Sequence, residues 1–200
     1  MIIPGDEHAA VFHAGAARAS QALSVWLGRP ASVVVDRLTA VSLAEATTLL
    51  GDDDSPVAVC AMQVSGGVSG VLLLACDDAA GLTLADLVLE RDPGTAAGWG
   101  DLERSAVVET ANIVGCGYLN AIAAGLGQGG SAGILPSPPW FVRDFPAAVM
   151  EAAVLGQVPA ADAVVLAATE FRIAGMPVKC GLVFVPDAAG LGVVVSGSGG

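Results

Sequence analysis

Three polar residues, Ser105, Glu109 and Asn112, recur at spacings of four and three in a segment that is otherwise poor in charge. On an α-helix of 3.6 residues per turn, these spacings place the three side chains on one face. A carboxylate can make charge-assisted contacts with a cation, and a carboxamide can hold a water molecule as donor and acceptor. We therefore take this face as the candidate site. The alternative is a solvated helix face, because E-x-x-N is a common sequence by chance.

The helix that positions these residues is predicted from Asp101 to Leu126, with Gly127 at its C-terminal end. Its apolar residues recur at spacings of three and four and predict a packing stripe about 90° away from the polar face. The predicted packing residues are Val108, Ala111, Gly115, Leu119, Ile122 and Leu126.

A stretch without Asp, Glu, Lys or Arg runs from Thr110 to Val142 and is long enough for a membrane span. However, Asn112, Asn120 and the run GLGQGGSAG at 125–133 interrupt it, and polar groups are costly inside a bilayer. The sequence favours a buried helix of a soluble protein, with no membrane insertion.

The chain contains an internal repeat. GVLLLACDDAAGL at 70–82 is echoed by GLVFVPDAAGL at 181–191, and the upstream helices align at an offset of 99 residues. We therefore predict one domain, 1–200, made of two repeats at about 1–95 and 101–200. At this offset Asp6, Ala10 and His13 stand opposite the three site residues. The first half is degenerate because it has neither the carboxylate nor the amide.

Each half is predicted to contain one long helix, several strands and shorter helices. Turn signals at 65–67 and 174–177 join neighbouring strands as hairpins. The predicted fold class is α+β, with pseudo-two-fold related halves that share a mainly antiparallel sheet and two long helices packed on it. The predicted helices are 7–27, 43–50, 82–90, 101–126 and 147–155, and the predicted strands are 31–41, 57–64, 68–76, 140–142, 163–173 and 178–185.

Composition and charge narrow the function classes. Hydrophobic residues make up 54% of the chain and charged residues 14%, which excludes a disordered protein. A net charge of -12 argues against a nucleic-acid binder and favours a partner with basic groups. Cys60, Cys76, Cys116 and Cys180 are widely spaced, and we expect four buried thiols in a reducing cytoplasm. No export signal is visible at the N-terminus.

The pattern Ser105-x3-Glu109-x2-Asn112, the following GCGYLNAIAAGLG and the PSPPWFVRD at 136–144 resemble the CheC/CheX/FliY family of chemotaxis phosphatases. The duplicated order of elements covers nearly the whole chain and is most similar to the CheC type. Two features depart from the family pattern. Ala10 and His13 leave the first copy without its motif, and Pro136 falls one residue later than in the family.

The resemblance implies hydrolysis of the aspartyl-phosphate on a CheY-type response regulator, at one intact site. Asn112 would hold the attacking water, Glu109 would pair with the regulator's lysine, and Ser105 would bind at the end of the contact face. The regulator would supply Mg²⁺, so no cofactor or metal of the chain's own is expected. The alternative is a non-catalytic module that sequesters a regulator or binds a CheD-type receptor deamidase. The cognate regulator and the oligomeric state stay open.

Overall fold

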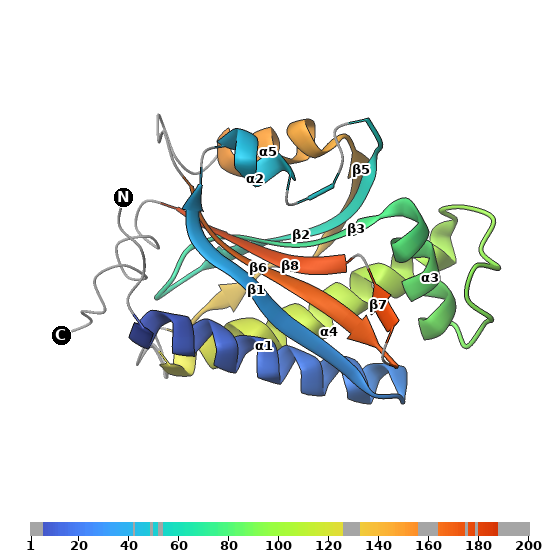
Figure 1. The fold of residues 1–200 in the computed structure, drawn as a ribbon, viewed down its shortest axis with the longest axis horizontal. Helices are drawn as coiled ribbons and strands as arrows, with labels where there is room; N and C mark the ends of the chain where they lie inside the picture. The colour runs from blue at the N-terminus through green and yellow to red at the C-terminus, as the bar shows by residue number, and fades with distance from the viewer. Residues whose placement is uncertain are drawn as a thin grey trace.

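Strands that are buried on both faces dominate the centre of this protein, which we describe from a computed structural model. The described residues are 6–41, 43–48, 50–51, 54–125, 133–155, 164–174, 176–178 and 180–187. An eight-stranded sheet lies between two helical layers, with α1 and α4 on one face and α2 and α5 on the other (Figure 1). The strand pairs within this sheet are antiparallel.

The elements follow one another in a nearly repeated order. The first part contains α1 (Asp6–Leu27), β1 (Ala31–Val41), α2 (Leu43–Thr48), β2 (Val57–Ser65), β3 (Gly70–Asp77) and α3 (Asp78–Val88). The second part contains α4 (Asp101–Gly125), β4 (Leu135–Pro136), β5 (Trp140–Asp144), α5 (Pro146–Leu155), β6 (Val164–Ile173), β7 (Met176–Val178) and β8 (Cys180–Pro186).

The predicted α+β class with an antiparallel sheet is confirmed, and every predicted helix and strand is present. Some boundaries were wrong. Strand β3 begins at Gly70 rather than Val68, β8 begins at Cys180 rather than Val178, and β7 occupies part of the turn predicted at 174–177. Helix α3 begins at Asp78 rather than at Leu82, because the Asp77 carboxylate accepts the Ala80 backbone N–H at 2.7 Å and caps the helix there. The short strands β4 and β7 were not predicted, and each pairs with only a few residues of its neighbour.

The strand order is β1-β6-β8-β3-β2-β4, and β5 also pairs with β2. The central pair therefore consists of β8 and β3, one strand from each part of the chain. The first long strand of each part crosses to the other part, since β1 pairs with β6 and β5 pairs with β2. A duplicated chain would give this order, and the division into two related halves stays a prediction.

Successive side chains of β3 pack into the two cores in turn, which explains why the chain is so apolar. Leu72, Leu74 and Cys76 belong to the core beneath α1 and α4, whereas Val71 and Leu73 belong to the core beneath α2 and α5. Neighbouring residues of a strand point to opposite faces, so a strand covered on both sides must be apolar throughout. The second helical layer, α2 and α5, completes this arrangement and was not foreseen as a separate layer.

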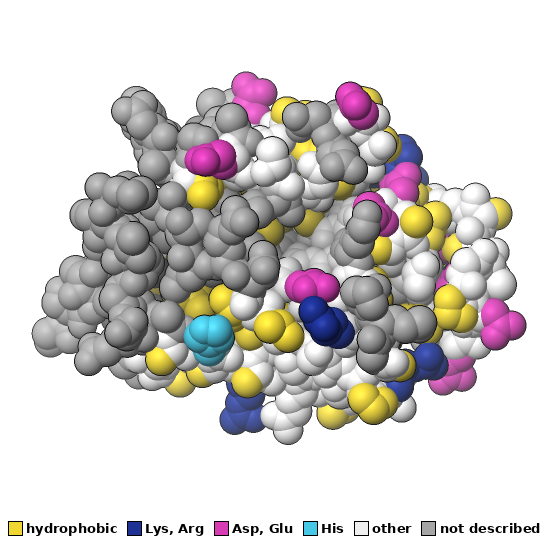
Figure 2. Space-filling view, in the orientation of Figure 1, with side chains coloured by type: hydrophobic (Ala, Val, Ile, Leu, Met, Phe, Trp, Pro, Cys, Tyr) yellow, Lys and Arg dark blue, Asp and Glu magenta, His cyan; other side chains and the backbone are white. Residues whose placement is uncertain are grey.

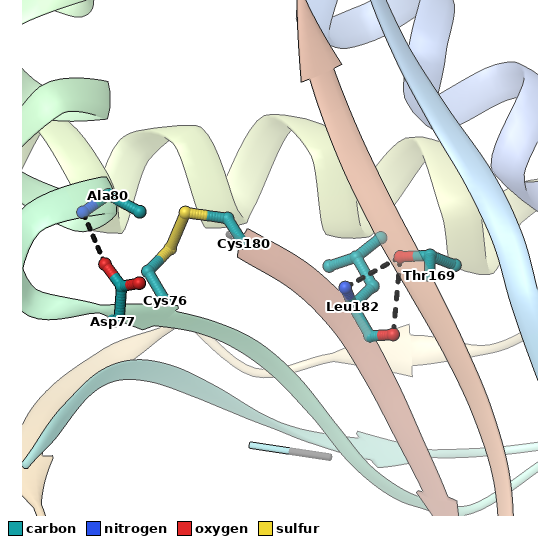
Figure 3. Close-up of a disulfide and its surroundings, with 6 residues drawn as sticks. All are labelled: Cys76, Asp77, Ala80, Thr169, Cys180 and Leu182. Atoms are coloured by element: carbon teal, nitrogen blue, oxygen red, sulfur yellow. Dashed lines mark hydrogen bonds between the residues drawn. A yellow bond between two sulfur atoms is a disulfide. The ribbon is translucent and has the colours of Figure 1, made fainter. Parts of the chain in front are cut away.

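The prediction of four free thiols was wrong for two of them. Cys76 of β3 and Cys180 of β8 lie directly opposite each other in the register, 4.1 Å apart at Cα, and form a disulfide (Figure 3). Next to it, the Thr169 hydroxyl of β6 accepts the Leu182 N–H at 2.8 Å (Figure 3). Cys60 is a free, buried thiol whose pKa is raised to about 12 by burial.

Candidate functional site

The three predicted site residues lie on α4 and reach the surface. Ser105 and Glu109 are exposed, and Asn112 is half-buried. Ala111, Gly115, Leu119 and Ile122 of the predicted packing stripe are buried, Val108 is half-buried, and Leu126 lies outside the described residues. The helix is buried more widely than predicted because it packs on the sheet, on α1 and on α3. Its free face therefore carries the candidate site.

Cys116, one turn after Asn112, contacts the candidate amide. Its Sγ donates to Asn112 Oδ1 at 3.7 Å. Burial, and to a lesser extent the charge of Glu109, raise the pKa of the Cys116 thiol, which keeps it protonated as a donor. The i, i+4 spacing could have revealed this contact from the sequence.

The start of α4 is anchored by Glu103, which the sequence analysis missed. One carboxylate oxygen accepts the Gly100 N–H at 3.1 Å, and the other accepts from Arg91 at 2.7 Å. The hydrogen bond from Arg91 holds the pKa of Glu103 below its usual range. A Glu at the third helical position that reaches back to the cap residue is half of a capping box. It determines where the helix begins and hence where its polar face lies.

Asp86 of α3 organises the loop that leads into α4. It is fully buried, and Arg91 lies 3.0 Å from it. Burial raises the pKa of Asp86, but the N–H donors and the charge of Arg91 outweigh burial and lower it. The N–H donors belong to Ala96, Thr95 and Gly94, at 3.1, 2.9 and 2.9 Å.

On one side of the polar face, α4 packs against α1 in an antiparallel pair. The Trp26 indole N–H at the end of α1 donates to Thr110 Oγ1 at 3.0 Å, and a Cβ placed on Gly125 at the end of α4 would contact Val11. Ala10 and His13, at the opposite end of the helix pair, are exposed. A groove of about 650 Å³ between the two helices is lined by Arg18, Gln21, Ala22, Val25, Trp26, Ile113, Gly117, Asn120, Ala121 and Ala124.

On the other side, α4 meets strand β5 through aromatic and charged groups. The Arg104 guanidinium lies 5.6 Å from the Phe141 ring centre, and Phe141 and Trp99 are 4.9 Å apart. Trp99 donates to Asp78 at 3.0 Å, and Arg143 binds the same carboxylate through two nitrogens. These hydrogen bonds, that from Arg143 first, lower the pKa of Asp78. The groups on this side are therefore paired with one another.

Within the described residues, no three His, Cys, Asp or Glu side chains are grouped as metal ligands. Among the helices described, α4 is long and apolar enough to cross a membrane by length and composition, yet 56% of its most apolar window is buried inside the fold. Core helices of globular proteins meet the same criterion.

The sequence matches no protein-family model, and no curated protein matches it either. Solved structures do match. FliY from Thermotoga maritima has a TM-score of 0.75 at 18% identity, over 98% of both chains. The FliM middle domain from H. pylori has a TM-score of 0.65 at 12% identity, over 97% of this chain and 99% of that one.

CheX in the CheX–CheY–BeF3–Mg²⁺ complex from Borrelia burgdorferi has a TM-score of 0.51 at 11% identity, over 87% of this chain and 96% of that one. FliY, the FliM middle domain and CheX therefore share one fold with this chain. The chain has the fold of the CheC/CheX/FliY family. Its assignment to the CheC type stays a prediction.

Proposed function

We propose that this protein is a phosphatase of chemotaxis signalling that hydrolyses the aspartyl-phosphate of a CheY-type response regulator. The observation that carries the proposal is the exposed face of α4, where a carboxylate and a carboxamide stand one turn apart on a helix with an anchored start. The fold supports it, because a CheX of this fold has been solved in complex with CheY. We expect the protein to act in the cytoplasm.

Asn112 positions the water. Its Oδ1 has two lone pairs, of which the Cys116 thiol uses one, so the other can accept a hydrogen from water. The water oxygen then forms a bond to phosphorus while the bond to the aspartate oxygen breaks, which releases phosphate and the free carboxylate. Phosphoryl transfer depends mainly on positioning and electrostatics, so no nucleophile in the phosphatase is needed. The Mg²⁺ that neutralises the phosphoryl charge belongs to the regulator.

Glu109 orients the complex. Its exposed carboxylate would pair with the lysine of the regulator's active site, a charge-assisted contact that sets the register of α4 against the partner. Ser105, one turn before it, would contact the partner at the end of this face. Ala10 and His13 replace the carboxylate and amide at the far end of the helix pair, so we propose a single active site.

The alternative is a binding module with little turnover, which would sequester a regulator or bind a CheD-type deamidase. The likeness to FliM supports it, since a FliM of this fold has been solved in complex with FliG. A protein of this fold can therefore act as a binding partner of another protein.

A dephosphorylation assay separates the two functions. We expect the protein to accelerate phosphate release from a phosphorylated CheY-type regulator, and Asn112→Ala to return the rate to that of the regulator alone. Glu109→Ala should weaken binding and lower the rate, whereas Glu151→Ala is the matched control, because this exposed carboxylate lies on α5, on the other face of the sheet. Binding of the beryllofluoride-loaded regulator without any acceleration would select the binding module instead.

A further inference from the structure

The polar face of α4 is too small to bind a protein by itself. A stable protein–protein interface buries about 800 Å² on each partner and involves about 20–30 residues a side. Ser105, Glu109 and Asn112 form a single row on one helix. A regulator that brings its phosphoaspartate to Asn112 must therefore also cover one flank of this row.

The two flanks differ in what they offer. On the β5 flank, Arg104 lies over Phe141, and Arg143 and Trp99 share the Asp78 carboxylate, so these groups already have partners. The α1 flank is hollow and apolar, and it exposes 78% of Val25 and 36% of Trp26. Acidic side chains on the face shown in Figure 2 lie mainly around α2, α5 and the end near α3.

Trp26 joins this groove to the site. Its indole is bonded to Thr110, which follows Glu109 in sequence, and the groove continues along α4 past Ile113, which follows Asn112. Consecutive residues of a helix point about 100° apart, so the groove lies beside the polar row, on its flank. Thr110 is itself held, since its hydroxyl donates to the Ala106 carbonyl at 2.8 Å. A tryptophan fixed in this way loses little freedom on binding, and partly exposed tryptophans dominate many interfaces.

We propose that the groove between α1 and α4 is the docking surface for the regulator's receiver domain, with Trp26 as its anchor. This inference rests on the proposed function and identifies how the substrate protein is held. The complementary surface is an apolar projection beside the phosphoaspartate, with a neutral or acidic group facing Arg18. Helix α1, from the half without the motif, thus supplies binding while α4 supplies chemistry.

The test measures binding and turnover with a CheY-type regulator loaded with beryllofluoride and Mg²⁺, or phosphorylated. We expect Trp26→Ala to raise both Kd and KM at least about tenfold while kcat is retained. Val25→Glu, a change at a highly exposed position, should do the same without disturbing the fold. Trp140→Ala is the matched control. This residue is 42% exposed but borders a separate cavity next to α5, and its loss should leave Kd unchanged.

The outcomes distinguish the two proposals. Acceleration by the wild type with an unchanged KM in both groove variants overturns the docking surface and leaves the proposed function standing. Binding that both groove variants weaken, without acceleration by the wild type, overturns the phosphatase and supports the docking surface. A larger loss of binding in Trp140→Ala than in Val25→Glu would place the interface on the α5 side of the sheet and overturn the docking surface, and no binding by the wild type overturns both proposals.

Discussion

Reduction of the Cys76–Cys180 disulfide should strongly destabilise the fold. The bond joins the two central strands and closes a loop with a sequence separation of 104. In the loop-entropy model, a loop of this length contributes roughly 4.7 kcal/mol through its restriction of the unfolded chain. A domain is stable by only about 5–15 kcal/mol, so reduction should remove a third or more of the stability.

Urea unfolding with and without dithiothreitol measures this effect. With a slope near 2 kcal/mol per molar, the midpoint should fall by about 2 M on reduction. Cys76 and Cys180 are 1% and 3% exposed, and reduction leaves both side chains in place, so no cavity adds to the change. Thiol titration in urea should count two thiols before reduction and four after it, because Cys60 and Cys116 are free.

The matched control is the double variant Cys76→Ala, Cys180→Ala, whose urea midpoint should not respond to dithiothreitol. An unchanged midpoint of the wild type on reduction, with four thiols counted, would refute the entropic argument. Disulfides are rare in a reducing cytoplasm, so thiol titration of freshly lysed cells would report which form is present there.

Two further predictions concern buried polar groups. Asp86→Asn should lower the urea midpoint at pH 7. Because the folded pKa of Asp86 is depressed, its contribution is present above the unfolded pKa of about 3.9 and is lost as pH falls through the folded value, so wild type and variant should converge in acid. A difference in urea midpoint between wild type and Asp86→Asn that stays constant down to pH 3 would contradict this. Tyr118→Phe should be neutral or stabilise by about 1 kcal/mol in thermal unfolding, since the buried hydroxyl has no partner within the described residues; a clear loss of stability would reveal one.

Local patterns in the sequence predicted the elements well, because periodicity and apolar runs are local signals. The helix from Asp101 and the strand from Ala31 start where predicted. Relations between elements were harder to predict. The pairing of Cys76 with Cys180 depends on the register of two distant strands, and the bond from Trp26 to Thr110 depends on how two helices pack.

At the candidate site, too, local features were predictable from the sequence and contacts between elements were not. Glu109 and Asn112 stand out from their types and spacing alone, since both lie on one helix. Asp86 and Glu103, which position that helix, have ordinary sequence surroundings and become recognisable only through their donors. The flanks of the site could not be predicted either, because α1 and β5 reach it from opposite directions through the fold.

The pairing of β1 with β6 and of β5 with β2 has a consequence for folding, because each pair joins the two parts of the chain. The backbone hydrogen bonds of β1 are made with β6, and those of β5 are made with β2. Neither part of the chain can therefore form its strand pairs without the other. Contacts between residues so far apart in sequence close late and slow the folding of a chain. The protein should therefore fold and unfold as one cooperative unit, and the helix that carries Asn112 should keep its place for as long as any of the sheet survives.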